Sequence, residues 1–89
     1  MSDTTSYLVL VEVRPRPDVA DPAGATVERS LPALGFDGIT QVRVGKAIRF
    51  LVRAENRDEA KLKAERLADT FLANPVIEEA EVSVLSTEP

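Results

Sequence analysis

Apolar residues recur at every second position, the period of a β-strand, in three parts of the chain, 7–13 (YLVLVEV), 39–54 and 79–85. The middle part is divided by Gly45 and Lys46, and a glycine in first place suits the two-residue turn of a hairpin. The sequence therefore predicts four strands. Their apolar faces carry Tyr7, Val9, Val11 and Val13; Val42 and Val44; Ile48, Phe50, Val52 and Ala54; and Ala80, Val82 and Val84.

A first helix is predicted between the first two strands. Asp21 is expected to cap its free amides, with Pro22 at the first helical position, where no backbone N–H is needed. Gly35 is expected to end the helix in the left-handed conformation, and Pro32 to loosen its last turn. Apolar residues then recur at helical spacing at Val27, Leu31 and Leu34.

A second helix is predicted over residues 56–73. Asn56 and Glu59 have the spacing of a capping box, Glu59 and Lys63 form an i,i+4 ion pair, and Pro75 stops the helix. The apolar stripe of this helix is expected to consist of Ala60, Ala64, Leu67 and Phe71, widened by Ala68 and Leu72.

The predicted element order is βαββαβ, in a single domain over residues 1–89 with frayed tails at 1–6 and 86–89. The fold class is α+β: two layers, with two helices on one face of a four-stranded, mostly antiparallel sheet, the order of ferredoxin-like folds.

The uncovered face of this sheet is expected to show four leucines. A homodimer or homotetramer that buries them, or that pairs a sheet edge, is predicted, because small domains gain stability by association. The alternative is that these residues lie at strand ends under loops. The candidate self-association residues are Leu8, Leu10, Leu51 and Leu85.

Composition excludes most catalytic chemistry. The chain has no His and no Cys, so His-assisted nucleophiles and thiolate metal sites are absent. Its 15 acidic and 11 basic residues argue against a general nucleic-acid binder. No apolar run approaches the roughly 20 residues that span a bilayer, and the polar start MSDTTS is unlike a signal peptide, so a cytoplasmic location is expected.

The chain carries no recognisable catalytic, cofactor or metal motif. Glu78 and Glu79 are adjacent, so in a strand they point to opposite faces and cannot work as a pair. The glycines near Pro22 and Lys46 do not form a phosphate-binding loop. Lys46 is expected to be an exposed turn lysine rather than an anion contact. No catalytic, cofactor-binding or metal-binding residue is therefore predicted.

Three segments, DPAGATVERSLPALGF (21–36), VRVGKAIRF (42–50) and LANPVIEEAEV (72–82), resemble the PurS family, the small subunit of phosphoribosylformylglycinamidine (FGAM) synthase. Order and spacing agree from about Tyr7 to Val82. The resemblance marks as candidate partner-contact or family-motif residues Asp21, Pro22, Gly24, Arg43, Gly45, Lys46, Asn74 and Pro75.

The resemblance implies a noncatalytic bridging subunit in de novo purine biosynthesis. Such a subunit docks a glutaminase to an ATP-dependent synthetase and assists the transfer of ammonia between them. The chain itself is expected to bind no cofactor, with ATP and Mg²⁺ on the large partner. Docking surfaces favour loops on a rigid scaffold, here 14–24, 45–46 and 73–79.

Two other functions share the predicted βαββαβ order. A stand-alone ACT-like module would bind an amino acid or another small molecule at a dimer interface. An RNA-recognition motif would stack bases on aromatic residues of its central strands. The segment VRVGKAIRFLV (42–52) offers only Phe50, which is expected to face the helices.

Overall fold

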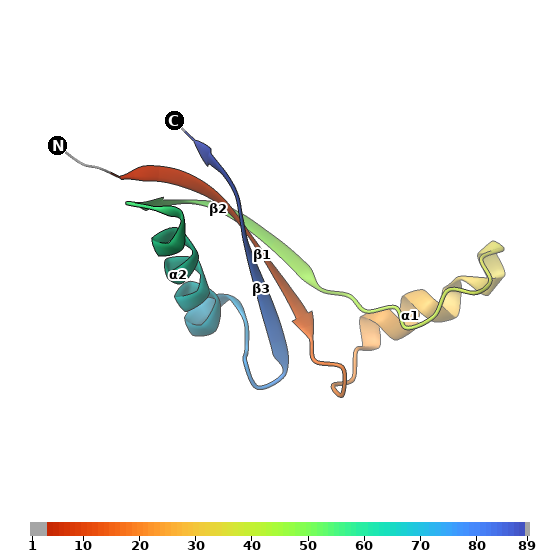
Figure 1. Ribbon diagram of the computed structural model, residues 1–89. Coiled ribbons are helices and arrows are strands. Elements are labelled where there is room, and N and C mark those ends of the chain that lie inside the picture. The colour runs from red at the N-terminus through yellow and green to blue at the C-terminus, as the bar shows by residue number, and fades with distance from the viewer. Residues whose placement is uncertain (1–3, 89) are drawn as a thin grey trace.

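The centre of the sheet is the apolar segment that begins at Thr5. In the computed structural model, which describes residues 4–88, β1 (Thr5–Pro15) pairs antiparallel with β2 (Lys46–Ala54) on one side and β3 (Glu78–Glu88) on the other (Figure 1). Two helices, α1 (Pro22–Ser30) and α2 (Arg57–Leu67), complete the order βαβαβ.

The predicted apolar faces of these three strands are confirmed by the register. Val9 lies between Phe50 and Val84, and Val11 lies between Ile48 and Val82. α2 covers this face of the sheet, where the side chains of Val9 and Val11 are fully buried (Figure 1). The central strand is apolar because it is buried between two neighbours and beneath a helix.

α2 packs against the sheet through small residues. Asn56 caps it by accepting a hydrogen bond from the Glu59 amide at 2.8 Å, and Lys63 pairs with Glu59 at 3.2 Å, both as predicted. The buried residues of α2 and of the segment that follows it recur every fourth position, together with the partly buried Leu72. These residues are Ala60, Ala64, Ala68 and Leu72.

The predicted end of the second helix is wrong in part. The segment Ala68–Leu72 widens into a π-turn, in which the Ala73 amide donates to the Ala68 carbonyl at 2.9 Å. This segment continues the buried row and turns Phe71 outward, 79% exposed, while Leu67 is also exposed. Neither of these residues belongs to the apolar stripe in which the sequence placed it.

The predicted start of α1 is confirmed, because Asp21 caps it and Pro22 opens it. Its predicted end is wrong in part: the α-helix stops at Ser30, and Gly35, whose φ is 90°, ends a separate 3₁₀ turn over Pro32–Leu34. Pro32 cannot supply an amide to continue the α-helix, so the tighter turn replaces it.

The predicted position of α1 on the sheet is wrong. Residues 16–45, called the arm below, leave the end of the sheet and carry α1 away from it (Figure 1). The apolar residues that were expected to cover the sheet are therefore exposed, among them Val27 and Leu34, the latter to 69%.

The predicted fourth strand and its hairpin are also wrong. Residues 41–45 form no ladder, and the chain returns from α1 directly into β2. The amides of Val42 and Val44 donate to side-chain carboxylates of Glu28 and Asp21 instead of to a neighbouring strand. Gly45 lies outside the positive-φ region; a Cβ there would approach the Val13 carbonyl oxygen to 2.5 Å, so glycine serves close backbone approach.

The expected frayed tails are shorter than predicted. Thr5 and Ser6 belong to β1, and residues 86–88 belong to β3, because they pair across the ladder. The remaining tail residues 1–3 and 89 lie outside the described part of the chain. The ACT-like and RNA-recognition alternatives lose their basis in the fold, since the sheet has three strands, not four.

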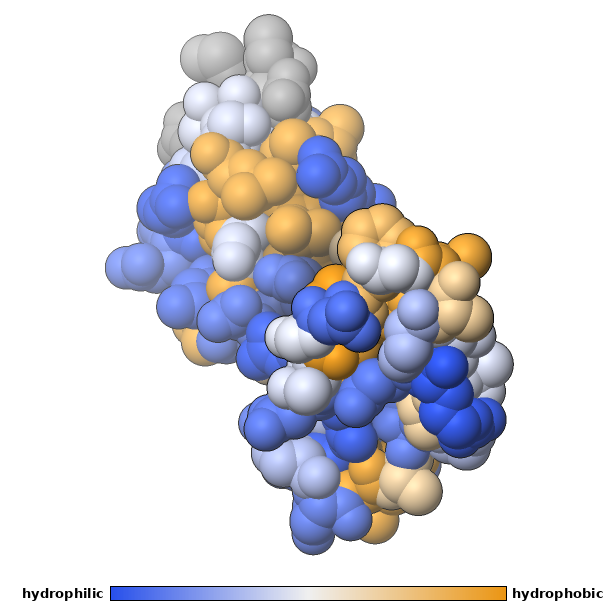
Figure 2. Space-filling view, turned by 90° about the vertical axis from the view of Figure 1, so that its right-hand side faces the viewer, coloured by the Kyte–Doolittle hydropathy of each residue, from blue (hydrophilic) through white to orange (hydrophobic). Residues whose placement is uncertain are grey.

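The sheet face away from α2 bears the four leucines as predicted. Leu8 lies opposite Leu51, and β3 has an irregular register beside Leu8, at the position of Leu85. Figure 2 shows apolar side chains gathered on this face, bordered by hydrophilic ones. This leucine patch (Leu8, Leu10, Leu51 and Leu85) includes two half-buried and two exposed members.

The arm gives the chain an extended shape, 60 × 28 × 14 Å. Its radius of gyration is 17.1 Å, whereas a compact chain of this length has about 12 Å. Its accessible surface is 6393 Å², against about 5,100 Å² for a compact monomer of this mass. A single copy therefore exposes more surface to water than a compact monomer of the same mass does.

Candidate functional site

Three connecting segments, residues 16–21, 41–45 and 73–77, meet where the arm leaves the sheet, and this place is called the junction below. Asp21 joins the first two of these segments. Its Oδ1 accepts a hydrogen bond from the Gly24 amide at 3.0 Å, and its Oδ2 accepts one from the Val44 amide at 2.7 Å. One carboxylate therefore caps α1 and fastens the returning segment 41–44 beside it.

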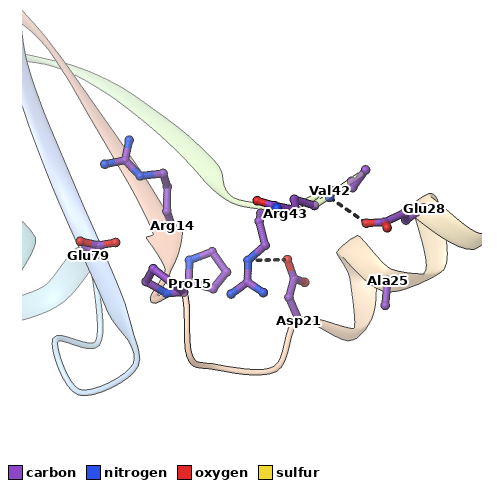
Figure 3. A pocket seen from close by; sticks show the side chains of 10 residues that line it. Arg14, Pro15, Asp21, Ala25, Glu28, Val42, Arg43 and Glu79 are labelled. Atoms are coloured by element: carbon purple, nitrogen blue, oxygen red, sulfur yellow. Dashed lines mark hydrogen bonds and ion pairs between the residues drawn. The ribbon is translucent and has the colours of Figure 1, made fainter. Parts of the chain in front are cut away.

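Arg43 closes the same junction from the returning segment. Its Nη2 donates to the carbonyl oxygens of Arg16 and Val19, each at 2.8 Å. Its Nε lies 4.0 Å from Asp21 Oδ2 (Figure 3). A guanidinium in this place spans the outgoing and returning chains at the base of the arm.

The electrostatics of the junction favour an ionised Asp21. Hydrogen bonds from the Gly24 and Val44 amides, and then the charge of Arg43, lower the pKa of Asp21 below its ordinary value of 3.8, against the opposing effect of burial. At neutral pH this carboxylate is charged and acts as an acceptor only, so it cannot serve as a general acid.

A second carboxylate extends the connection along α1. Glu28 accepts a hydrogen bond from the Val42 amide at 2.9 Å (Figure 3). Between the two carboxylates lies Gly24, where an added Cβ would clash with the Val42 carbonyl oxygen. The helix and the returning segment can approach this closely only because residue 24 has no side chain.

Arg16 joins the arm to the turn that precedes β3. Its Nε and Nη2 donate to the Pro75 carbonyl oxygen at 3.0 and 2.7 Å, and its amide donates to the Ile77 carbonyl at 2.9 Å. Asn74 shapes this turn, since its Oδ1 accepts from the Val76 amide at 3.1 Å. The Asn74–Pro75 turn is thereby held against the base of the arm.

A hollow of about 600 Å³ opens between the base of the arm and the end of the sheet (Figure 3). Its wall includes Asp21 and Glu28, which are engaged by backbone amides, and Arg14, which lies 3.5 Å from Glu81. The lining residues are Arg14, Pro15, Pro17, Asp21, Ala25, Glu28, Gln41, Val42, Arg43 and Glu79.

The wall of this hollow holds no nucleophile paired with a base. Over residues 4–88, no group of three or more Asp, Glu, His or Cys side chains is placed to hold a metal ion. No helix in that range is long and apolar enough to cross a membrane. The polar side chains here mainly hold backbone segments in place.

The structure brings most of the candidate motif residues together. Asp21, Pro22, Gly24, Arg43 and Gly45 all lie at the junction. Lys46 follows at the start of β2 with an exposed side chain, and Asn74 and Pro75 join the site through Arg16. The leucine patch lies apart, on the open face of the sheet.

Two residues of the junction were missed in the sequence. Glu28 had a usable signal, because it follows Asp21 by seven positions and so lies on the same face of the helix. Arg16 had none, since its partner carbonyl is 59 positions away.

Comparison with known proteins gives a consistent result. The family model PurS: Phosphoribosylformylglycinamidine (FGAM) synthase matches residues 8–86. The phosphoribosylformylglycinamidine synthase subunit PurS of Synechocystis sp. is 42% identical over 73 residues, which cover 82% of this chain and 73% of that protein.

Solved structures agree in fold. The crystal structure of the PurS subunit of phosphoribosylformylglycinamidine synthase from Thermotoga maritima matches with a TM-score of 0.85 and 35% identity, over 92% of this chain and 94% of that one. A chain in the structure of PurLQS from the same organism matches with a TM-score of 0.83 and 35% identity, over 90% of this chain and 98% of that one.

Proposed function

Because this chain belongs to the PurS family, the small subunits of FGAM synthase, we propose that it bridges the glutaminase and synthetase subunits of that ligase complex in purine biosynthesis. The chain is a subunit of a ligase complex, and the proposal concerns what it does there. It supplies docking surfaces, and its partners supply the reaction.

The junction at the base of the arm is the observation that carries this proposal. Asp21, Arg43 and Arg16 bond to backbone atoms of the three connecting segments, so they fix the shape of a surface. Rigid turns on a sheet are well suited to binding another protein, because little conformational entropy is lost on docking.

The chemistry of ammonia explains why such a subunit is useful. In water at neutral pH ammonia is mostly ammonium, which is not a nucleophile. A glutaminase must therefore stand close to the synthetase, so that ammonia crosses a path from which water is excluded. ATP and Mg²⁺ belong to the large partner in this proposal, and this chain binds no cofactor.

Self-association is the second part of the proposal. The leucine patch, with Leu51 57% exposed, lies on a sheet face that no helix within residues 4–88 covers (Figure 1). We expect a homodimer or homotetramer in which this face is buried, since apolar area of this kind is stabilised when it leaves water.

The experiment that tests the bridging role compares two nitrogen donors. Synthase activity of the large subunit plus the glutaminase is measured with and without this chain, using glutamine and then ammonium. The chain should be required with glutamine and dispensable with ammonium. If it changes neither rate, the bridging role is wrong.

A charge reversal near the junction tests the same bridging role at a single residue. Lys46→Glu should lower the glutamine-dependent rate about tenfold and leave the ammonium rate unchanged, as expected for a contact at a protein interface. Lys61→Glu is the matched control, because Lys61 is also an exposed lysine and lies on α2. Equal effects of the two changes would place the partner elsewhere.

A further inference from the structure

We propose that the edge of β3 binds an extended, basic segment of one of the two partner subunits, which adds to the sheet as a further strand beside Ala80 and Val82. This inference rests on the bridging role proposed above and names the chemistry by which a partner docks. The surface differs from both the junction and the leucine patch.

β3 lies at one edge of the sheet, with β1 as its neighbour among the described strands (Figure 1). In an antiparallel pair, successive residues point their N–H and C=O groups alternately toward the neighbouring strand and away from it. The Arg16 amide donates to the Ile77 carbonyl, so Ile77 faces β1 and the next residue faces away. Every second residue from there on faces outward: Glu78, Ala80, Val82 and Val84.

Two contacts agree with this alternation and close the edge at its ends. The Glu78 amide donates to a carbonyl of the turn that precedes β3, at 2.7 Å. The Arg57 guanidinium, at the start of α2, donates to the Val84 carbonyl oxygen. Between these contacts, the outward N–H and C=O groups of Ala80 and Val82 have no hydrogen-bond partner within residues 4–88. Such a stretch of edge can pair with an incoming strand.

A hollow of about 230 Å³ lies beside this stretch, between β3 and α2. Its lining combines three apolar residues, Ala68, Ala80 and Val82, with the carboxylates of Glu65 and Asp69. Small-molecule sites usually begin at about 300 Å³, so this hollow suits a single long side chain. A lysine or arginine matches both parts of the lining, because its stem packs on apolar surface while its charge meets the carboxylates.

The carboxylates of the hollow lack a cation in the described part of their own chain. Glu65 and Asp69 are four positions apart, where like charges repel, and neither side chain has an ion pair or hydrogen bond within residues 4–88. On the opposite face of β3, Glu79 and Glu81 are exposed, and Glu81 pairs with Arg14. A basic strand added here therefore meets acidic side chains on both faces.

The other edge of the sheet is unsuited to a basic segment. β2 carries Lys46, Arg49 and Arg53 and no acidic residue. Cationic side chains protect an edge strand from pairing, and they repel a basic strand in particular. The edge of β2 is also closed at Arg53, whose carbonyl oxygen accepts a hydrogen bond from Lys63 Nζ at 2.9 Å. Charge therefore selects β3.

A second copy of β3 is a poor occupant of the same edge. Two copies of β3 side by side would bring Glu79 and Glu81 of one chain close to those of the other, and like charges that face each other destabilise a pair of strands. The occupant is therefore assigned to a partner subunit and not to another copy of this chain.

Hydrogen–deuterium exchange, read residue by residue after quenching, tests the edge directly. In the chain alone, the amides of Ala80 and Val82 should exchange at least about tenfold faster than those of Glu79 and Glu81, which donate to β1. Assembly with the glutaminase and synthetase subunits should slow the two outward amides at least about tenfold. Unchanged exchange of both outward amides in the assembled complex would overturn the proposal.

Ala80→Pro blocks the edge and leaves the hydrogen bonds to β1 in place, because the Ala80 amide points away from that strand. Binding is measured with each partner subunit separately. The dissociation constant for the partner that uses this edge should rise at least about tenfold. The far-UV spectrum and the mass of the chain alone should stay unchanged. A lower mass would show that the edge joins copies of this chain, and the assignment would then be wrong.

Asp69→Lys tests the basic character of the segment without altering the backbone. It should weaken binding of the same partner at least about tenfold, because a like charge then faces the incoming side chain. Glu55→Lys is the matched control, since Glu55 is also an exposed acidic residue and precedes the other end of α2. Equal affinities of the Asp69→Lys chain and the unaltered chain would rule out a basic occupant.

These outcomes are separable from those of the bridging assay. If the chain is required with glutamine, and the Ala80→Pro and Asp69→Lys variants bind both partners as tightly as the unaltered chain, the bridging role stands and the edge is not the docking surface. If the unaltered chain binds neither partner, both proposals are wrong.

Discussion

Asp21 shows how much a single side chain can organise in this chain. Its carboxylate accepts the Gly24 amide at the start of α1 and the Val44 amide of the returning segment, and it faces Arg43. Gly24 is close to Asp21 in the sequence, whereas Val44 is 23 positions away. The base of the arm depends on this residue being ionised.

The pKa of Asp21 predicts how the arm responds to acid. Because the folded pKa is lowered below 3.8, the stabilisation is complete above pH 3.8 and is lost as the pH falls below that value toward the folded pKa. The amide proton of Val44, followed by NMR, should shift with a midpoint below 3.8.

Asp21→Asn is the control for this titration. It removes the titrating group, so the Val44 amide should no longer respond in this pH range. A midpoint at or above 3.8 in the unchanged chain would contradict the geometry of the junction.

At the scale of elements, α2 depends on small side chains. Ala60 and Ala64 are fully buried against the sheet, and Ala68 continues their row through the π-turn. Alanine at these positions lets the helix approach the strands closely. The larger apolar residues of the same segment, Leu62, Leu67 and Phe71, are left exposed on the outer side.

Enlarging this contact should destabilise the fold. Ala64→Val should lower the free energy of unfolding by about 1–3 kcal/mol, because a close-packed site has no room for two more methyl groups. Urea denaturation at a fixed protein concentration measures the change.

Glu65→Val separates packing from helix propensity. Glu65 is exposed on the same helix, so this change should cost less than about 0.7 kcal/mol. If the two substitutions have equal effects, the contact of α2 with the sheet is not close-packed at Ala64.

At the scale of the whole molecule, the extended shape is the dominant property. The radius of gyration of 17.1 Å exceeds that of a compact chain because the arm carries α1 away from the sheet (Figure 1). Stability of the arm is therefore expected to come from another copy.

Thermal stability should depend on protein concentration. A tenfold dilution weakens a dimer by about 1.4 kcal/mol through mass action, which should lower its Tm by a few degrees. Calorimetry at two concentrations measures the shift. A Tm that is independent of concentration would show that single copies are stable as they stand.

Much of the fold was predictable from local patterns. The faces of three strands follow from period-two alternation around residues such as Val9 and Val11, and the start of α1 follows from Asp21 and Pro22. In both cases the physical cause acts within a few residues of the chain. The candidate motif residues were named from the resemblance to the family, because their contacts join distant segments.

The path of residues 41–45 and the position of α1 were not predicted, because they depend on contacts between segments far apart in the chain. The alternation of Val42 and Val44 predicts a strand, but the carboxylates of Glu28 and Asp21 take their amides. The apolar spacing of α1 predicts a helix that packs on a sheet, but it does not specify that this sheet belongs to the same chain. By itself the sequence determined the start of each helix, three of the four predicted strands and the apolar faces of those three strands. Only the tertiary structure decided that α1 leaves its own sheet, because close approach at Gly24 and Gly45 and the bonds of Arg43 and Arg16 join atoms far apart in the chain.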